Sequence, residues 1–220
     1  MRCALLFDLD GTMLDTDTIH RGVFGDMLAG AGHDVTEAFY LDKIHGRLNA
    51  DIFADLLPDA GDPQQLSEDK EAEFRNRLPK PYPGMPGVDR LVARAQDAGW
   101  GLAVVTNAPR LNADAMLEAI GLRDAFEVVI IGEECARGKP DPLPYVTAMQ
   151  RLEIDPARAV AFEDSPSGMR AAAASGALAV GIRSSLSDTE LRSHGAQLTL
   201  QDFNDKALDD VLRRITGETA

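Results

Sequence analysis

The sequence of 220 residues predicts an α/β protein, a doubly wound (Rossmann-like) parallel sheet core with an inserted α-helical cap domain. Two observations predict it. From residue 85 onward, helical segments alternate with short, wholly apolar strands, as in a parallel sheet that is covered on both faces. Between the first strand and this alternation, about 70 residues follow a helical pattern without a clear strand. We therefore expect residues 1–15 and 82–220 to form the core, and residues 16–81 the cap.

The expected core elements are apolar runs and periodic segments separated by glycine or polar residues. The apolar run at residues 3–7 predicts the first, buried strand. Helices near residues 86–98 and 111–120 end at Gly99 and Gly121, because glycine readily ends a helix. The other strands are expected at residues 102–105, 128–131, 159–162 and 178–182, with helices after Asp141 and over residues 169–175.

The expected cap is helical because its apolar residues recur at helical spacing from about residue 17 to residue 78. The pattern is interrupted by Gly30 and Gly32 and by the stretch between Pro58 and Pro63. The segment at residues 79–84 is rich in proline and cannot continue a helix. It therefore predicts a stiff linker back to the core.

Composition disfavours several classes of partner. The formal net charge is −14, from 22 basic and 36 acidic residues, which disfavours binding to nucleic acid or to an anionic membrane. The first residues hold one arginine and a short apolar run broken by Asp8, unlike a signal peptide or a membrane span. Two cysteines, Cys3 and Cys135, are too few for a disulfide framework. We expect a cytoplasmic protein.

The strongest chemical signal is the pair Asp8 and Asp10 at the end of the first strand. Residues two apart on a strand project to the same side, so the two carboxylates can converge. Two acids this close repel each other unless a cation lies between them or they share a proton. The pair therefore predicts a magnesium site or an acid/base pair, with loop solvation or helix capping as the structural alternative. Gly11 then lets the chain turn sharply.

Three later strands also end in polar groups. They are followed by Thr106 and Asn107, by the segment from Gly138 to Pro142, and by the segment from Glu163 to Gly168. The carboxyl ends of parallel strands lie on one edge, so these groups and the first pair are expected to meet in one pocket. Hydroxyl, amide and lysine groups suit phosphate, and carboxylates suit a hard cation. Each segment alone could equally be a turn or a helix cap.

Four motifs together resemble those of the haloacid dehalogenase-like (HAD) hydrolases, and the resemblance covers nearly the whole chain. The motifs are Phe-Asp-Leu-Asp-Gly-Thr at residues 7–12, Val-Thr-Asn at 105–107, Gly-Lys-Pro-Asp-Pro at 138–142, and Phe-Glu-Asp-Ser-Pro-Ser-Gly at 162–168. A helical cap between the first two is similar to the β-phosphoglucomutase-like and phosphoglycolate phosphatase-like subgroup. True dehalogenases lack an acid at the position of Asp10, so this aspartate favours phosphoryl transfer.

The resemblance implies a role for each core residue. Asp8 would attack phosphorus, and Asp10 would protonate the leaving group and then deprotonate water. Thr106 and Lys139 would hold the transferring phosphoryl group, with help from backbone amides near Leu9 and Asn107. The magnesium ligands would be Asp8, the backbone carbonyl of Asp10, and Asp164, with Glu163 as a further ligand or as a supporting partner. Such an oxygen ligand set fits Mg²⁺ better than zinc.

The cap residues bear on the substrate. Thr16 and His20 follow the first motif, and His20 matches a position where β-phosphoglucomutase-like proteins also carry histidine, although an exposed imidazole at a polar helix start is the alternative. The segment His45-Gly46-Arg47-Leu48-Asn49 resembles the specificity loop of that mutase. The mutase carries a lysine where His45 stands and an arginine where Asn49 stands, so the mutase reading is weakened. Arg47 either compensates for the missing cations or is solvated.

The sequence thus predicts a Mg²⁺-dependent phosphatase that acts on a small phosphorylated metabolite, such as a sugar phosphate or a phospho-acid like phosphoglycolate. A phosphohexomutase with the same aspartyl phosphate is the alternative, and a non-catalytic ligand-binding protein is a further one. We expect a monomer or weak homodimer. The residues expected to bind substrate are Thr16, His20, His45, Gly46, Arg47, Asn49 and Asn107.

Overall fold

The computed structural model describes residues 2–44 and 47–217 and divides into two compact units. The α/β unit comprises Met1–Asp15 with Lys80–Ala220, and the helical unit comprises Thr16–Pro79. The second junction lies between residues 79 and 80, whereas the sequence placed it between residues 81 and 82. That the helical unit acts as a cap stays a prediction.

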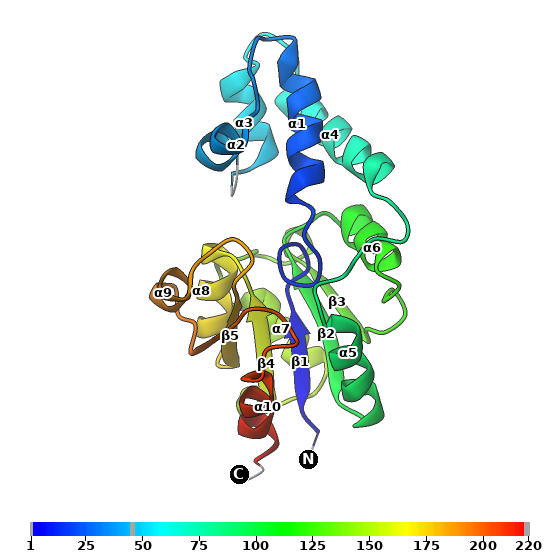
Figure 1. The fold of residues 1–220 in the computed structure, drawn as a ribbon, viewed down its shortest axis with the longest axis vertical. Helices are drawn as coiled ribbons and strands as arrows, with labels where there is room; N and C mark the ends of the chain where they lie inside the picture. The colour runs from blue at the N-terminus through cyan, green and yellow to red at the C-terminus, as the bar shows by residue number, and fades with distance from the viewer. Residues whose placement is uncertain (1, 45–46, 218–220) are drawn as a thin grey trace. The chain divides into compact units, whose positions relative to one another are not determined.

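The α/β unit is built on one six-stranded parallel sheet with the order β3-β2-β1-β4-β5-β6 (Figure 1). The chain therefore builds the sheet outward from β1 on one side, crosses over, and continues on the other side from β4. The topological switch lies between β1 and β4, where ligands bind in open α/β sheets. The strands are β1 (Ala4–Phe7), β2 (Gly101–Thr106), β3 (Val128–Ile131), β4 (Ala159–Glu163), β5 (Leu178–Ile182) and β6 (Leu198–Leu200).

Helices pack on both faces of this sheet (Figure 1). On one face, α7 (Leu143–Arg151) and α8 (Pro166–Ala174) share a core with alternate strand residues such as Leu6 and Ala161. On the other face, Phe7 stacks on Phe162 with ring centroids 5.1 Å apart, and Phe203 packs edge-on against both rings. There α5 (Val88–Asp97) contacts β2 and α10 (Leu208–Thr216) contacts β4.

The expected fold class and all five expected strands are confirmed. The helix α6 (Arg110–Ala119) lies where expected, and Gly99 and Gly121 follow α5 and α6 with left-handed φ angles of +66° and +72°. No element is expected after residue 182, whereas the structure adds α9 (Asp188–Ser193), β6 and α10. A three-residue strand and a six-residue helix are too short for periodicity to reveal. Two short 3₁₀ turns, η1 (Gly132–Glu134) and η2 (Pro156–Arg158), complete the unit.

The helical unit contains α1 (Asp17–Ala29), α2 (Glu37–Lys43), α3 (Asn49–Leu56) and α4 (Pro63–Arg77), and its described residues form no strand. Its own core includes Phe24 and Phe53, whose ring centroids lie 5.5 Å apart. Side chains of Thr36 and Asp62 cap α2 and α4. Across the described part of the chain, no helix has the length and apolar character needed to cross a membrane.

Candidate active site

The site lies at the carboxyl ends of β1 and β4, the two strands that flank the topological switch. Phe7 and Phe162 are register partners, so Asp8 and Glu163 follow them side by side. Asp8 lies just past β1, Glu163 is the last residue of β4, and Asp164 comes next. The sequence thus brings two of its four motifs together at one point, as the parallel-sheet argument predicts.

Asp8, Glu163 and Asp164 form a buried acidic cluster. Each offers one carboxylate oxygen, and these oxygens all lie within 4.8 Å of one another. The exposed fractions of these residues are 8%, 0% and 8%, respectively. Carboxylates buried this closely need a cation or protons to offset their repulsion. The cluster is therefore a candidate metal site.

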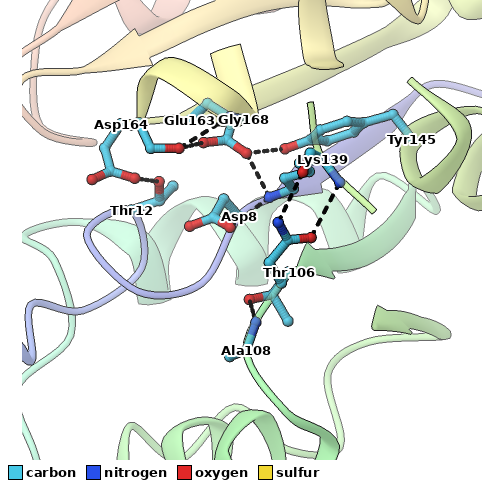
Figure 2. Close-up of polar contacts among 11 residues, drawn as sticks. Asp8, Thr12, Thr106, Ala108, Lys139, Tyr145, Glu163, Asp164 and Gly168 are labelled. Atoms are coloured by element: carbon cyan, nitrogen blue, oxygen red, sulfur yellow. Dashed lines mark hydrogen bonds and ion pairs between the residues drawn. The ribbon is translucent and has the colours of Figure 1, made fainter. Parts of the chain in front are cut away.

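Lys139 supplies one positive charge to this cluster. Its ammonium Nζ donates to Oδ1 of Asp8 at 2.6 Å and to Oε1 of Glu163 at 2.5 Å (Figure 2). The ammonium contacts two of the three carboxylates. The three carboxylates of the cluster carry two more negative charges than this one ammonium offsets when all are ionised. That deficit equals the charge of one divalent cation, and oxygen-only ligands suit Mg²⁺.

Burial changes the acidity of these groups. It raises the pKa of Asp8 from 3.8 to about 7, even though Lys139 favours the charged form. Burial and the neighbouring charges of Asp8 and Glu163 raise the pKa of Asp164 well above its ordinary value. For Lys139, burial opposes the charged form, but the two carboxylates outweigh it and raise the pKa of the ammonium. Without a bound cation, the cluster therefore holds protons that separate carboxylates would release.

Asp164 is held by the loop that follows β1. Thr12 donates from Oγ1 to Oδ1 of Asp164 at 3.2 Å, and Ser184 donates to Oδ2 at 3.3 Å. Gly11 has a φ of +82°, and a Cβ atom on it would lie 2.1 Å from Oδ2 of Asp164. Only glycine therefore allows this loop to approach the carboxylate so closely. Thr12 and Ser184 had not been selected from the sequence.

The structure also places the other expected core residues. Asp10 lies in the loop after β1, and its charge is among those that raise the pKa of Asp8 and Asp164. Its carboxylate is not part of the acidic cluster, and the ligand expected from Asp10 was its backbone carbonyl. Thr106 ends β2, is buried, and accepts a hydrogen bond from the Ala108 amide at 3.0 Å.

Asn107, expected to bind substrate, holds the backbone of Lys139 in this structure. Its side-chain amide donates to the Lys139 carbonyl and accepts from the Lys139 amide, both at 3.2 Å. The amide group lies in a slot lined by glycine, because a Cβ atom on Gly132 would lie 2.1 Å from its Oδ1 and one on Gly138 would lie 3.1 Å from it. Asn107 thus fixes the loop from which the Lys139 ammonium reaches the acids.

Glu163 is enclosed by hydrogen-bond donors. Besides Lys139, the Tyr145 hydroxyl donates to Oε1 at 2.8 Å (Figure 2). The Ser165 hydroxyl donates to Oε2 at 3.2 Å. A Cβ atom on Gly168 would lie 2.0 Å from the carboxylate, so the first turn of α8 also closes over it. Sequence reasoning missed Tyr145. Its position on the apolar face of α7 gives a reason to bury the ring but does not identify the partner of its hydroxyl.

In the helical unit, two of the expected substrate residues belong to one polar network around the buried Lys70. Lys70, on α4, has a side chain that is only 3% exposed. Its ammonium lies 2.7 Å from Nδ1 of His20 and donates to Glu71 at 2.9 Å. Asn49 donates to the same Glu71 oxygen, and the His20 ring stacks on Phe74 at 4.1 Å. Lys70 and Glu71 were missed, although a lysine at the spacing of Leu66 and Phe74 on one helix face is a signal of burial.

The remaining expected residues of this unit have separate surroundings. Thr16 is buried directly before α1. Arg47 donates to the Lys43 carbonyl at 2.9 Å and to Asp55 at 3.3 Å, so its guanidinium contacts its own unit. His45 and Gly46 lie outside the described residues.

Comparisons with known proteins agree on a family. A family model described as a haloacid dehalogenase-like hydrolase matches residues 4–176. Protein CbbY of Rhodobacter capsulatus is 32% identical over 196 residues, which cover 79% of this chain and 82% of that protein. Fructose-1-phosphate phosphatase YqaB of Escherichia coli is 31% identical over 181 residues, which cover 81% of this chain and 95% of that protein.

A solved structure agrees as well. The crystal structure of a CbbY mutant from Rhodobacter sphaeroides, in complex with xylulose-(1,5)bisphosphate, superposes with a TM-score of 0.80 at 29% identity. The match covers 92% of this chain and 95% of that one. The predicted family and the predicted enzyme class, a phosphatase, are thereby confirmed. The chain is an enzyme and belongs to the haloacid dehalogenase-like hydrolases.

Proposed function

We propose that this enzyme is a Mg²⁺-dependent phosphatase that removes phosphate from a small phosphorylated sugar through an aspartyl phosphate on Asp8. The observation that carries the proposal is the buried cluster of three carboxylates with one ammonium, in which Lys139 contacts one oxygen of Asp8. Lys139 contacts Oδ1, so Oδ2 is the oxygen that remains for the attack on phosphorus.

The residues present fit a bound Mg²⁺. Asp8, Asp164 and the backbone carbonyl of Asp10 would hold the ion, with Glu163 beside it as a ligand or as a supporting partner. The support is the uncompensated charge of the cluster and the raised pKa of Asp8 and Asp164. When bound, Mg²⁺ supplies positive charge that offsets these carboxylates and the transferring phosphoryl group.

The proposed reaction has two balanced steps. Oδ2 of Asp8 forms a bond to phosphorus, the bond from phosphorus to the leaving oxygen breaks, and Asp10 gives its proton to that oxygen. Water then attacks the phosphorus of the aspartyl phosphate and gives a proton to Asp10. The bond between phosphorus and Asp8 breaks, which releases inorganic phosphate and restores both acids. Lys139 and Thr106 hold the phosphoryl oxygens during both steps.

The proposed substrate class is supported by the relatives, one of which is named a fructose-1-phosphate phosphatase and another of which was crystallised with xylulose-(1,5)bisphosphate. We propose that the helical unit selects the sugar through Thr16, His20, His45, Gly46, Arg47 and Asn49. We propose that Asn107 contributes to substrate binding mainly by holding the backbone of Lys139. Asn49 and Arg47 contact acids of their own unit, so the structure adds no support for a mutase. The free thiols of Cys3 and Cys135 accord with a reducing compartment, so a cytoplasmic location remains part of the proposal.

The test is release of phosphate from a generic aryl phosphate with Mg²⁺ and with EDTA, followed by a panel of sugar phosphates and phosphoglycolate. Asp8→Asn should abolish turnover in a folded protein, because an amide is a poor nucleophile. Asp124→Asn makes the same chemical change at an exposed turn and should leave turnover unchanged. Full activity in EDTA, or in Asp8→Asn, would refute the proposed chemistry. Conversion of a sugar 1-phosphate to its 6-phosphate isomer would assign the enzyme as a mutase instead.

A further inference from the structure

Tyr145 is a buried residue that the proposed reaction does not use. It lies in the first turns of α7, is 0% exposed, and belongs to the apolar core between α7 and the sheet. A tyrosine hydroxyl in such a core needs a hydrogen-bond partner. Here the partner is Oε1 of Glu163 at 2.8 Å, the same oxygen that accepts from Lys139 at 2.5 Å.

Tyr145 also contacts Lys139, through its ring. The Lys139 ammonium lies 5.2 Å from the centroid of the Tyr145 ring, which is within the range of a cation–π interaction. The ring therefore faces the ammonium while the hydroxyl contacts the carboxylate beside it (Figure 2). One side chain thus touches both members of the Lys139–Glu163 pair.

We propose that Tyr145 is a positioning residue for Lys139, because its hydroxyl holds Glu163 as a fixed anchor and keeps the ammonium shared between Glu163 and Asp8. A carboxylate oxygen has two lone pairs, and Tyr145 and Lys139 occupy both on Oε1. Ser165 donates to the other oxygen, Oε2. Tyr145 and Ser165 therefore hold the carboxylate of Glu163 at both oxygens while it accepts from Lys139. The inference rests on the proposed function, in which Lys139 holds the phosphoryl group.

Loss of the hydroxyl has a definite physical consequence. Oε1 of Glu163 would then be offset by Lys139 alone, so the ion pair between Glu163 and Lys139 would tighten. The ammonium would move toward Glu163 and away from Asp8, where the phosphoryl group is transferred. A hydrogen bond to a charged group corresponds to roughly a 10- to 100-fold change in rate when it acts in the transition state.

The decisive substitution is Tyr145→Phe, which keeps the ring and the core volume and removes only the hydroxyl. Tyr40→Phe is the matched control, because Tyr40 is also a buried tyrosine whose hydroxyl donates to a carboxylate, Asp17, in the helical unit. We expect kcat/KM for an aryl phosphate to fall about 10- to 100-fold in Tyr145→Phe, with little change in Tyr40→Phe. Mg²⁺ affinity, measured by calorimetry without substrate, should stay at the wild-type value in both.

A double-mutant cycle separates positioning from packing. In a Glu163→Gln background, Tyr145→Phe should have little further effect on kcat/KM, because the anchor is already altered. An equal loss in both backgrounds would mean that Tyr145 acts independently of Glu163 and would overturn the proposal. A parallel loss of Mg²⁺ affinity in Tyr145→Phe would also overturn it, since the hydroxyl would then support the metal ligands.

A measurement without substrate makes this test independent of the proposed function. The NMR signal of the Lys139 ammonium, assigned by its absence in Lys139→Ala, reports its hydrogen bonds in the free protein. Tyr145→Phe should shift this signal, and Tyr40→Phe should not. If the wild type hydrolyses no phosphate ester, the proposed function fails, but a shift would still support the positioning of Lys139. An unshifted signal in Tyr145→Phe would overturn the inference whether or not the enzyme is active.

Discussion

The close approach of Gly11 to Asp164 allows a sharp prediction for Gly11→Ala. A Cβ atom at this position would lie 2.1 Å from Oδ2 and 2.6 Å from Cγ of Asp164, inside any acceptable contact. The carboxylate would have to move by about an ångström, which breaks its bonds to Thr12 and Ser184. We therefore expect Gly11→Ala to damage the metal site as well as the fold.

Two contributions make up the expected effect. The φ of +82° at Gly11 lies in the left-handed region, where an alanine costs about 1–2 kcal/mol. Displacing the Asp164 carboxylate should lower Mg²⁺ affinity by roughly 10- to 100-fold, the usual effect of disturbing the groups that orient a metal ligand. Gly121→Ala is the control that separates the backbone cost from the displacement of the carboxylate, because the φ of Gly121 is +72° and a Cβ atom there would meet nothing within 4 Å. Gly121→Ala should have only the backbone cost.

The assay is urea unfolding of both variants together with calorimetric titration of Mg²⁺. Both variants should lose a similar free energy of unfolding from backbone strain, with a further loss in Gly11→Ala. Only Gly11→Ala should bind Mg²⁺ more weakly and need more of it for turnover of an aryl phosphate. Wild-type Mg²⁺ affinity in a folded Gly11→Ala protein would refute the placement of Asp164 at the metal.

Three further predictions concern pH, the lysine loop and the helical unit. Without divalent cations, the folded protein holds a proton on Asp8 between pH 3.8 and about 7 that the unfolded chain releases, so thermal stability should fall as pH rises through this range. Mg²⁺ should remove this pH dependence. A flat stability profile in EDTA would contradict the raised pKa of Asp8. Gly132→Ala places a Cβ atom 2.1 Å from Oδ1 of Asn107, the side chain that holds the Lys139 backbone, and should reduce kcat/KM about 100-fold without backbone strain. Wild-type kinetics in Gly132→Ala would show that Asn107 does not position Lys139. Glu71→Ala leaves the buried Lys70 without its carboxylate and should cost roughly 3–5 kcal/mol in urea unfolding, whereas Glu68→Ala on the exposed face of α4 should cost little.

The fold was largely readable from the sequence because its signals are local. Apolar runs such as the one at residues 128–131 and the glycines that end α5 and α6 each reflect interactions within a few residues. The last strand of the sheet was harder to predict. The strand β6 has three residues and relies on pairing with β5, a non-local contact that leaves no period in the sequence.

In the site, too, local signals could be predicted from the sequence and non-local contacts could not. The motifs around Asp8, Thr106, Lys139 and Glu163 could be placed on one edge because strand direction alone fixes where their ends lie. The contacts that hold those groups could not be placed, since Thr12 meets Asp164 across 152 residues and Asn107 meets Lys139 across 32. A threonine in a tight loop and an asparagine after a strand look the same in the sequence whether or not such a partner exists.

The position of Lys139 shows why these long-range contacts matter for chemistry. An ammonium beside buried acids gains most of its free energy from whichever carboxylate it approaches, so an unsupported lysine would settle against one of them. Here Asn107 holds its backbone, while Tyr145 offsets part of the charge on Glu163. The ammonium is thereby kept on Asp8 as well, at 2.6 Å. Its place at the proposed nucleophile thus depends on neutral side chains as much as on the charges themselves.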